Sequence, residues 1–196
     1  MRLRGWLFAA VLFFAVPRAD ASVSFTVVLD ALVEESSAAC LATPVDSRSV
    51  WEDGRIATYT RVHVDRVFAG SLADEVWVKT LGGAVGDIGQ IVDGEAVLRR
   101  GQQSVLFLTS YEGSLVVTAR GQGQFAIVRD GSVLRLRKNA HAGALLAPNP
   151  AALAKVRART TIATAVTPAA DVLDGKTIDD AAAVVSASWT RTHARP

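Results

Sequence analysis

Hydrophobic and polar residues alternate along the segment that begins at Ile56. Threonine and valine recur at every second position up to Val64, and Tyr59, Arg61, His63 and Asp65 occupy the positions between them. A period of two places each set of side chains on its own face of a strand. The pattern therefore predicts a half-buried β-strand, which ends near residues 69–70.

Short apolar or alternating segments recur along the chain, and several are separated by Asp-Gly or Glu-Gly pairs. Asp-Gly pairs favour the two-residue turns of β-hairpins. The segment 105–108 is apolar on both faces, as in a central strand, whereas Pro44 is expected to end the first strand. The pattern predicts a mainly β fold, an antiparallel barrel or sandwich. Its further strands are predicted at residues 39–42, 76–80, 104–109, 115–119, 125–128 and 133–136.

Helical spacing of apolar residues appears on both sides of this β region. Residues 24–37 have apolar side chains three or four positions apart and predict an amphipathic helix. Asn149-Pro150 is typical of the start of a short helix to about residue 157. Thr177 and Asp180 resemble a capping box that opens a second C-terminal helix, and the chain from about residue 190 is expected to fray.

The first 21 residues predict a secretory signal peptide. Arg2 and Arg4 precede an apolar segment, and Ala19-Asp20-Ala21 fits a cleavage site after Ala21. The apolar segment is shorter than the roughly 20 residues that span a bilayer. We therefore expect a secreted or periplasmic protein that does not insert into the membrane after cleavage. Its domains would be a β-barrel domain with an N-terminal helix at residues 22–147 and a helical C-terminal extension and tail at 148–196.

Cleavage changes the charge of the chain. The sequence has 21 basic and 19 acidic residues, and removal of Arg2, Arg4, Arg18 and Asp20 leaves 18 of each. A formally neutral chain does not indicate binding to nucleic acid, for which a clustered basic face is expected. The single cysteine, Cys40, cannot form an internal disulfide and is expected to be a buried apolar residue.

The sequence contains no recognisable catalytic or cofactor motif. The glycine-rich segment 82–89 lacks the lysine and the following helix of a phosphate-binding loop, so we interpret it as a sharp corner. His63 and Asp65 share one strand face and are conceivable as an acid–base or metal pair, although a solvated strand face is the commoner role of such residues. We expect no enzymatic activity, no cofactor and no metal.

Tryptophan and arginine are the side chains most typical of protein interfaces. Trp77 alternates with Val76 and Val78 and is expected to point away from the core, and Arg135 and Arg137 lie two residues apart on one strand face. These arginines either protect an edge strand from pairing with a neighbour or help to bind a partner. We predict Trp77, Arg135 and Arg137 as partner-binding residues.

The glycine corner at 80–83, Gly94-Glu95, the apolar segment 105–108 and the segment 121–125 together resemble a loose family of uncharacterised secreted bacterial proteins. More remotely, the strands and flanking helix are similar to the five-stranded OB-type barrel of netrin-like and metalloprotease-inhibitor domains. The resemblance implies a small antiparallel OB-like barrel. Those inhibitors present an N-terminal cysteine to the protease metal, whereas this chain after cleavage begins at Ser22.

Three functional hypotheses follow. The first is a non-enzymatic secreted or periplasmic module that binds an unknown protein partner. The second, from fold analogy, is a protease inhibitor or accessory protein whose partner is an extracellular protease. The third is a hydrolase that uses His63 and Asp65, which requires a concave pocket around them.

Overall fold

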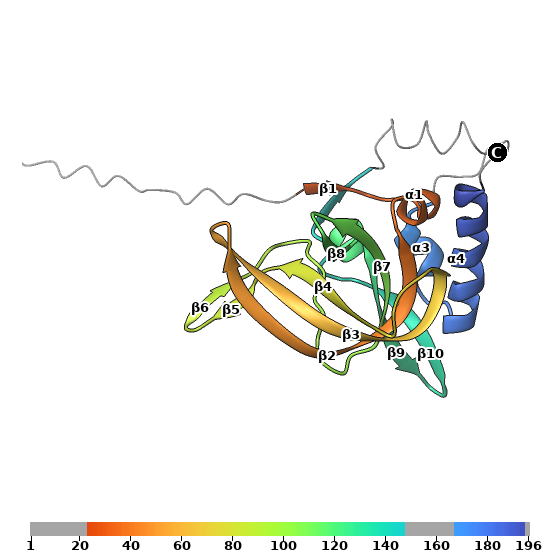
Figure 1. Cartoon of the computed structure of the whole chain (residues 1–196). Helices are drawn as coiled ribbons and strands as arrows, with labels where there is room; N and C mark the ends of the chain where they lie inside the picture. Colours follow the sequence, from red (N-terminus) through yellow and green to blue (C-terminus); the bar gives the residue numbers. More distant parts are fainter. Residues whose placement is uncertain (1–22, 148–166, 195–196) are drawn as a thin grey trace, which may run out of the picture.

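A computed structural model describes residues 23–147 and 167–194 of the chain (Figure 1). The predicted signal peptide, the helix at 150–157 and most of the segment between the predicted C-terminal helices lie outside these residues. Within the described ranges, no helix is both long and apolar enough to cross a membrane.

A long antiparallel hairpin forms the centre of the fold. Strands β2 (Ala38–Glu52) and β3 (Arg55–Gly70) pair along most of their length. Asp53 and Gly54 make the turn between them and have φ angles of 49° and 75°, both positive as in a type I′ turn. The turn predicted from Asp-Gly is confirmed.

Strand β2 continues past Pro44, so the prediction that proline ends it at residue 42 is wrong. Proline has no N–H to donate to a neighbouring strand. The pairing of β2 with β7 stops at Ala42, and the register of β2 with β3 is irregular between Pro44 and Asp46. Pro44 therefore lies where β2 has an edge on one side and a bulge on the other, a position that tolerates proline.

Hydrogen bonding joins five strands into a ring. Strand β4 (Glu75–Leu81) pairs with β3, β7 (Ser104–Tyr111) pairs with β2, and β8 (Ser114–Val117) pairs with both β4 and β7. The β4–β8 pair is parallel. The predicted all-antiparallel arrangement is therefore wrong. Strand directions cannot alternate around a ring with an odd number of members, so at least one parallel pair is required.

The remaining strands extend this sheet or form separate pairs. Strand β9 (Gln124–Asp130) adds to β7, and β10 (Val133–Lys138) pairs with β9. The glycine-rich segment forms a small hairpin of β5 (Gly83–Val85) and β6 (Ile88–Gln90), which confirms the predicted corner. Strands β1 (Val23–Phe25) and β11 (Ala144–Leu146) form a parallel pair.

The helices of the described residues are α1 (Leu29–Glu34), the 3-10 helix η1 (Arg120–Gly123), α3 (Ala169–Leu173) and α4 (Ile178–His193). The predicted N-terminal helix at 24–37 is too long, because its first residues pair with β11 instead. The Thr177 cap is confirmed, since the Asp180 backbone N–H donates to Thr177 Oγ1. The chain does not fray at residue 190; α4 continues to His193, whose ring stacks on Trp189 at 3.7 Å between centroids.

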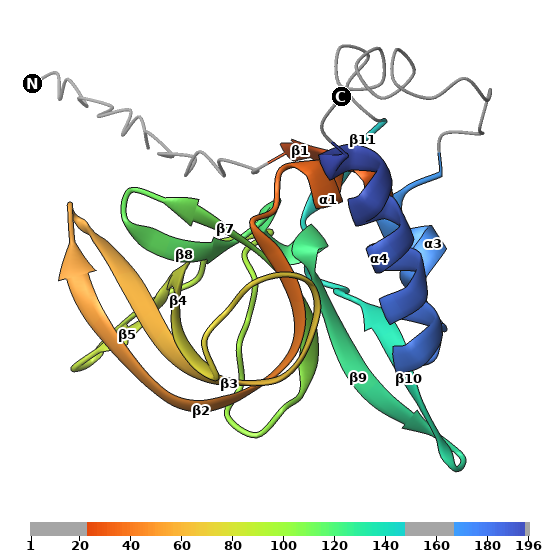
Figure 2. The same cartoon turned by 45° about the vertical axis from the view of Figure 1, so that its right-hand side comes forward.

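Two apolar clusters share strands β2 and β7. Leu106 and Leu108 of β7 pack with residues from the other ring strands, whereas Val105 and Phe107 pack with residues of α1, α3 and α4. Successive residues of a strand point to opposite faces, so β7 separates the two clusters. This confirms the central strand predicted from its doubly apolar sequence. Helix α4 lies beside α1 and α3, at the end of the molecule away from the turns of the β2–β3 and β7–β8 hairpins (Figure 2).

Candidate functional site

The outward face of β2, β3 and β4 carries aromatic and basic side chains next to one another. The strand register places Tyr59 between Arg48 of β2 and Lys79 of β4, and it places Arg61 beside Trp77. We refer to these five residues as the aromatic–basic face. The alternation predicted from Ile56 onward is confirmed, because Val62 and Thr60, on the opposite side of β3, are buried.

Cation–π contacts hold the aromatic–basic face together. The guanidinium carbon of Arg48 lies 5.4 Å from the ring centroid of Trp77 and 5.9 Å from that of Tyr59. Lys79 Nζ lies 5.7 Å from the Tyr59 centroid. These distances are within the range of favourable cation–π interactions. Trp77 remains 42% exposed, so its ring is accessible as predicted from the sequence.

Glu52 and Lys79 form the border of this face. Lys79 Nζ lies 2.6 Å from Glu52 Oε2, and the Tyr59 hydroxyl donates to the same carboxylate. The bond from Lys79 lowers the pKa of Glu52 below its usual range, and the bond to Glu52 raises the pKa of Lys79. Both groups are therefore charged at neutral pH, and both continue into the neighbouring cleft.

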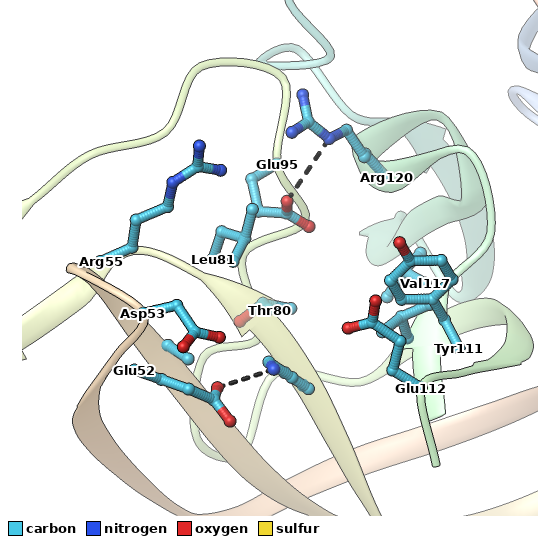
Figure 3. A pocket seen from close by; sticks show the side chains of 13 residues that line it. Glu52, Asp53, Arg55, Thr80, Leu81, Glu95, Tyr111, Glu112, Val117 and Arg120 are labelled. Atoms are coloured by element: carbon cyan, nitrogen blue, oxygen red, sulfur yellow. Dashed lines mark ion pairs between the residues drawn. The ribbon is translucent and has the colours of Figure 1, made fainter. Parts of the chain in front are cut away.

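A cleft of about 670 Å³ opens beside this border, between the turns of the β2–β3 and β7–β8 hairpins (Figure 3). Its charged lining is of both signs, and its apolar lining comes from strands β3, β4 and β8. The lining residues are Glu52, Asp53, Arg55, Ala57, Lys79, Thr80, Leu81, Glu95, Tyr111, Glu112, Val116, Val117 and Arg120. Its volume is in the range of small-ligand sites.

Glu95 and Arg120 bring an ion pair to the wall of the cleft. Glu95 is 8% exposed, and its Oε2 lies 3.7 Å from Arg120 Nε. Burial raises the pKa of the Glu95 carboxyl, while the backbone N–H of Ala96 and the charge of Arg120 oppose that shift. Ala119 and Arg120 have φ angles of 53° and 56°. This left-handed backbone is unusual outside glycine.

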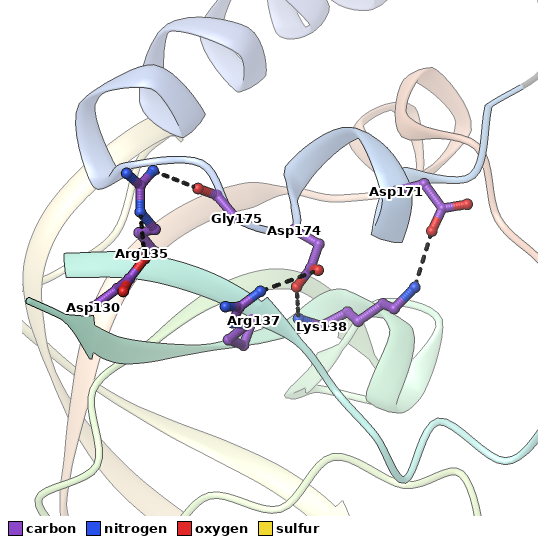
Figure 4. A network of polar contacts seen from close by, with 7 residues as sticks. All are labelled: Asp130, Arg135, Arg137, Lys138, Asp171, Asp174 and Gly175. Carbon is purple, nitrogen blue, oxygen red and sulfur yellow. Dashed lines mark hydrogen bonds and ion pairs between the residues drawn. The ribbon is translucent and has the colours of Figure 1, made fainter. Parts of the chain in front are cut away.

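Arg135 and Arg137 bind other parts of the same chain. Arg135 Nε lies 3.2 Å from Asp130 Oδ2, and its NH1 donates to the carbonyl oxygen of Gly175 at 2.9 Å. Arg137 NH1 lies 3.6 Å from Asp174 Oδ2 (Figure 4). The contacts with Gly175 and Asp174 attach β10 to the turn between α3 and α4, whereas Asp130 belongs to β9 of the same hairpin. Their predicted role in partner binding stays a prediction.

The structure does not bring the three predicted partner-binding residues together. Trp77 is on β4, and Arg135 and Arg137 are on β10, with at least three strands between them whichever way the ring is followed. Only Trp77 belongs to the aromatic–basic face.

His63 and Asp65 lie outside the cleft. His63 is exposed and stands between Thr43 of β2 and Glu75 of β4. Asp65 Oδ2 accepts hydrogen bonds from the Thr43 hydroxyl and from Gln103 Nε2. The hydrolase hypothesis needs a pocket that converges on this pair, and the cleft described above is lined by other residues.

Across residues 23–147 and 167–194, no group of three or more His, Cys, Asp or Glu side chains is arranged to hold a metal ion. Cys40 is fully buried, as predicted, and burial together with the nearby Asp65 charge raises the pKa of its thiol to about 12.

Comparison with known proteins identifies no relative. No family model, no curated protein and no solved structure matches the chain.

The cleft was not predicted from the sequence. Both of its hairpin turns were predicted, from Asp53-Gly54 and Glu112-Gly113, but they are about 60 positions apart in the chain. Pairing of β8 with β4 brings them to the same end of the molecule (Figure 2). Neither Glu95 nor Arg120 was predicted as a site residue, and Gly94-Glu95 entered the sequence analysis only as part of the family resemblance.

Proposed function

We propose that the chain is a non-enzymatic, exported protein-binding module built on an OB-like barrel. The ring of β2, β3, β4, β8 and β7 supports the barrel assignment, since OB-type barrels have five strands. In such barrels the face of the second and third strands and the loops between strands one and two and between strands four and five bind ligands. The aromatic–basic face and the cleft occupy the equivalent positions here.

The exposed ring of Trp77, stacked beside Arg48, is the observation that carries the proposal. Tryptophan, tyrosine and arginine dominate the binding energy of protein interfaces. A tryptophan held in place by a neighbouring guanidinium loses little side-chain entropy on binding, which favours affinity. The hydrogen bonds that Thr43 and Gln103 donate to Asp65 also favour a binding role over the hydrolase hypothesis. They tie the Asp65 carboxylate to neighbouring polar groups.

The test is capture of partners by residues 22–196 from envelope and culture-supernatant extracts. Trp77→Ala is compared with Trp51→Ala, because Trp51 is also exposed, at 51%, but precedes Glu52 on β2 and points to the opposite face. We expect a stoichiometric protein partner that the Trp77 variant loses and the Trp51 variant keeps. If both variants capture the partner as well as the parent chain does, the aromatic–basic face is not the partner-binding surface.

The identity of that partner separates the first two hypotheses. A protease that is saturably inhibited on binding supports the inhibitor hypothesis, and any other partner supports a general binding module. If the captured complex turns over a substrate and the isolated chain does not, the activity belongs to the partner and the non-enzymatic assignment holds.

A further inference from the structure

The charged side chains of the cleft are partly separated by sign, although the Glu95 carboxylate, paired with Arg120, lies on the side of the arginines. The guanidinium groups of Arg55 and Arg120 lie along one edge, whereas the carboxylates of Asp53 and Glu112 face each other across the cleft (Figure 3). Lys79, which also lines the cleft, is already paired with Glu52. The cleft therefore presents one region for an anion and another for a cation.

We propose that the cleft binds a short zwitterionic peptide segment. Its carboxylate contacts Arg55 and Arg120, and its ammonium group lies between Asp53 and Glu112. This inference rests on the proposed function, because the natural source of such a segment is then the protein partner that approaches the neighbouring aromatic–basic face.

The first support is that three of these groups have no partner within the chain. In the described residues, the side chains of Asp53, Arg55 and Glu112 make no ion pair or hydrogen bond. Arg120 is already engaged, with Nε 3.7 Å from Glu95 Oε2, and adds positive charge beside Arg55. Charges that are already matched inside the protein contribute less to binding a ligand than these do.

The second support is the backbone of the lining residues. Among the described residues, four other than glycine have positive φ angles: Asp53, Glu112, Ala119 and Arg120. Three of the four line the cleft. Two-residue hairpin turns account for this conformation at Asp53 and Glu112. At Arg120, outside such a turn, it costs about 1–2 kcal/mol for a residue with a Cβ atom, and such strain gathers at functional sites.

The two carboxylates also hold equivalent places in their hairpins. Asp53 and Glu112 are each the first residue of a two-residue turn, each has a φ angle of 49°, and each precedes glycine. Two-residue turns fix the backbone positions of Asp53 and Glu112 on opposite sides of the cleft. The exposed ring of Tyr111, beside Glu112, adds a second group that attracts an ammonium ion.

The size and apolar lining of the cleft suit a peptide. A tripeptide extends over about 10 Å, and Leu81, Val116 and Val117 supply apolar surface along the cleft for its backbone and small side chains. A cleft of about 670 Å³ accommodates a ligand of this size.

Trialanine provides the test, in four forms: unblocked, N-acetylated, C-amidated and blocked at both ends. Binding to residues 22–196 is measured by calorimetry or by amide chemical shifts at neutral pH. We expect the unblocked form to bind best, and each block to weaken binding by about tenfold or more, the loss of one charged hydrogen bond.

Variants then assign each end of the peptide. Glu112→Gln is expected to reduce the effect of acetylation, because only Asp53 then remains beside the ammonium group. Arg55→Gln is expected to reduce the effect of amidation, because only Arg120 then remains beside the carboxylate. Both residues are at the exposed hairpin ends, so neither substitution disturbs the apolar clusters. Asp179→Asn and Arg129→Gln change the net charge equally at positions outside the cleft and should leave the affinities of all four peptides unchanged.

The inference is overturned if unblocked trialanine does not bind, or if the doubly blocked form binds as tightly. It is also overturned if the Glu112 and Arg55 variants discriminate among the four forms as the parent chain does. Trp77→Ala, which lies outside the cleft, should retain peptide binding. Failure of partner capture and failure of peptide binding are therefore separate results.

Discussion

Lys79 Nζ and Glu52 Oε2 lie 2.6 Å apart and join the aromatic–basic face to the cleft. The pKa of Glu52 is lowered below 4.5 by the bond from Lys79, and the pKa of Lys79 is raised above 10.5 by the same bond. A lowered carboxyl pKa stabilises the fold above about pH 4.5 and loses this effect as the pH falls through the folded value. A raised lysine pKa stabilises it below about pH 10.5 and loses the effect as the pH rises further.

We expect Glu52→Gln to reduce the stability of the protein at neutral pH and to reduce it less in acid. Below the pKa of Glu52 the parent chain has already lost the ion pair, so the two stability curves should converge there. Urea unfolding at a series of pH values from 7 down to about 3 measures this. Curves that stay parallel over that range would contradict the assignment.

Cys40 should be chemically inert in the folded protein. The thiolate is the reactive form, and a pKa of about 12 leaves almost none of it at neutral pH. Burial also excludes reagents. We expect an aromatic disulfide reagent to label Cys40 only at the rate of unfolding, and completely in denaturant. Rapid labelling of the native protein, or a disulfide-linked dimer on a non-reducing gel, would show that the thiol is accessible.

Gly83→Ala is expected to destabilise the protein more than Gly86→Ala. Both glycines have positive φ angles, 126° and 58°. A Cβ atom at Gly83 would overlap Thr58 Oγ1 and come within 2.5 Å of Ser49 Oγ, whereas one at Gly86 would meet nothing within 4 Å. The cost should be about 1–2 kcal/mol at Gly86, from backbone strain alone. At Gly83 the overlap adds to a strain of similar size. Chemical denaturation of both variants tests the order, and equal losses would contradict it.

Asp30 anchors α4 through two contacts of different strength. Its Oδ1 accepts from Ser188 Oγ at 2.5 Å and lies 2.8 Å from Arg191 NH2. Ser188 is fully buried, so Asp30→Ala leaves its hydroxyl without this partner, at a cost of about 1–3 kcal/mol. Arg191 is half exposed, and Arg191→Ala should cost about 0–1 kcal/mol.

Hydrogen exchange in α4, together with global unfolding, measures the anchor. Ser188→Ala is the control, because removal of the buried hydroxyl leaves Asp30 its contact with Arg191 and should cost less than Asp30→Ala. The explanation fails if Arg191→Ala loosens α4 as much as Asp30→Ala does.

Several features of the fold could be predicted because their causes are local. The alternation after Ile56 depends only on which residues are apolar, and the turn at Asp53-Gly54 depends on two residues that tolerate positive φ angles. Thr177 caps α4 through a residue three positions away. Trp77 was predicted to be exposed from its two neighbours, and it is.

Features that depend on distant parts of the chain were not predicted. Residues 23–25 resemble the start of a helix, but their partners in β11 are about 120 positions away. Proline ends a strand only where the strand needs hydrogen bonds to neighbours on both of its edges. At Pro44 one edge of β2 is free of β7, because the β2–β7 pairing stops at Ala42. The partners of Arg135 and Arg137 are in the α3–α4 turn, which no pattern in β10 reveals.

The sequence by itself determined most strands of the large sheet, several of their turns and the outward direction of Trp77, because hydrophobic period and turn chemistry act over a few residues. Tertiary structure alone decided the cleft. Five strands can close into a ring only with a parallel pair, and the β4–β8 pairing places Glu112 opposite Asp53. That pairing depends on contacts across the whole fold, so the charges of the cleft meet only when the ring has closed.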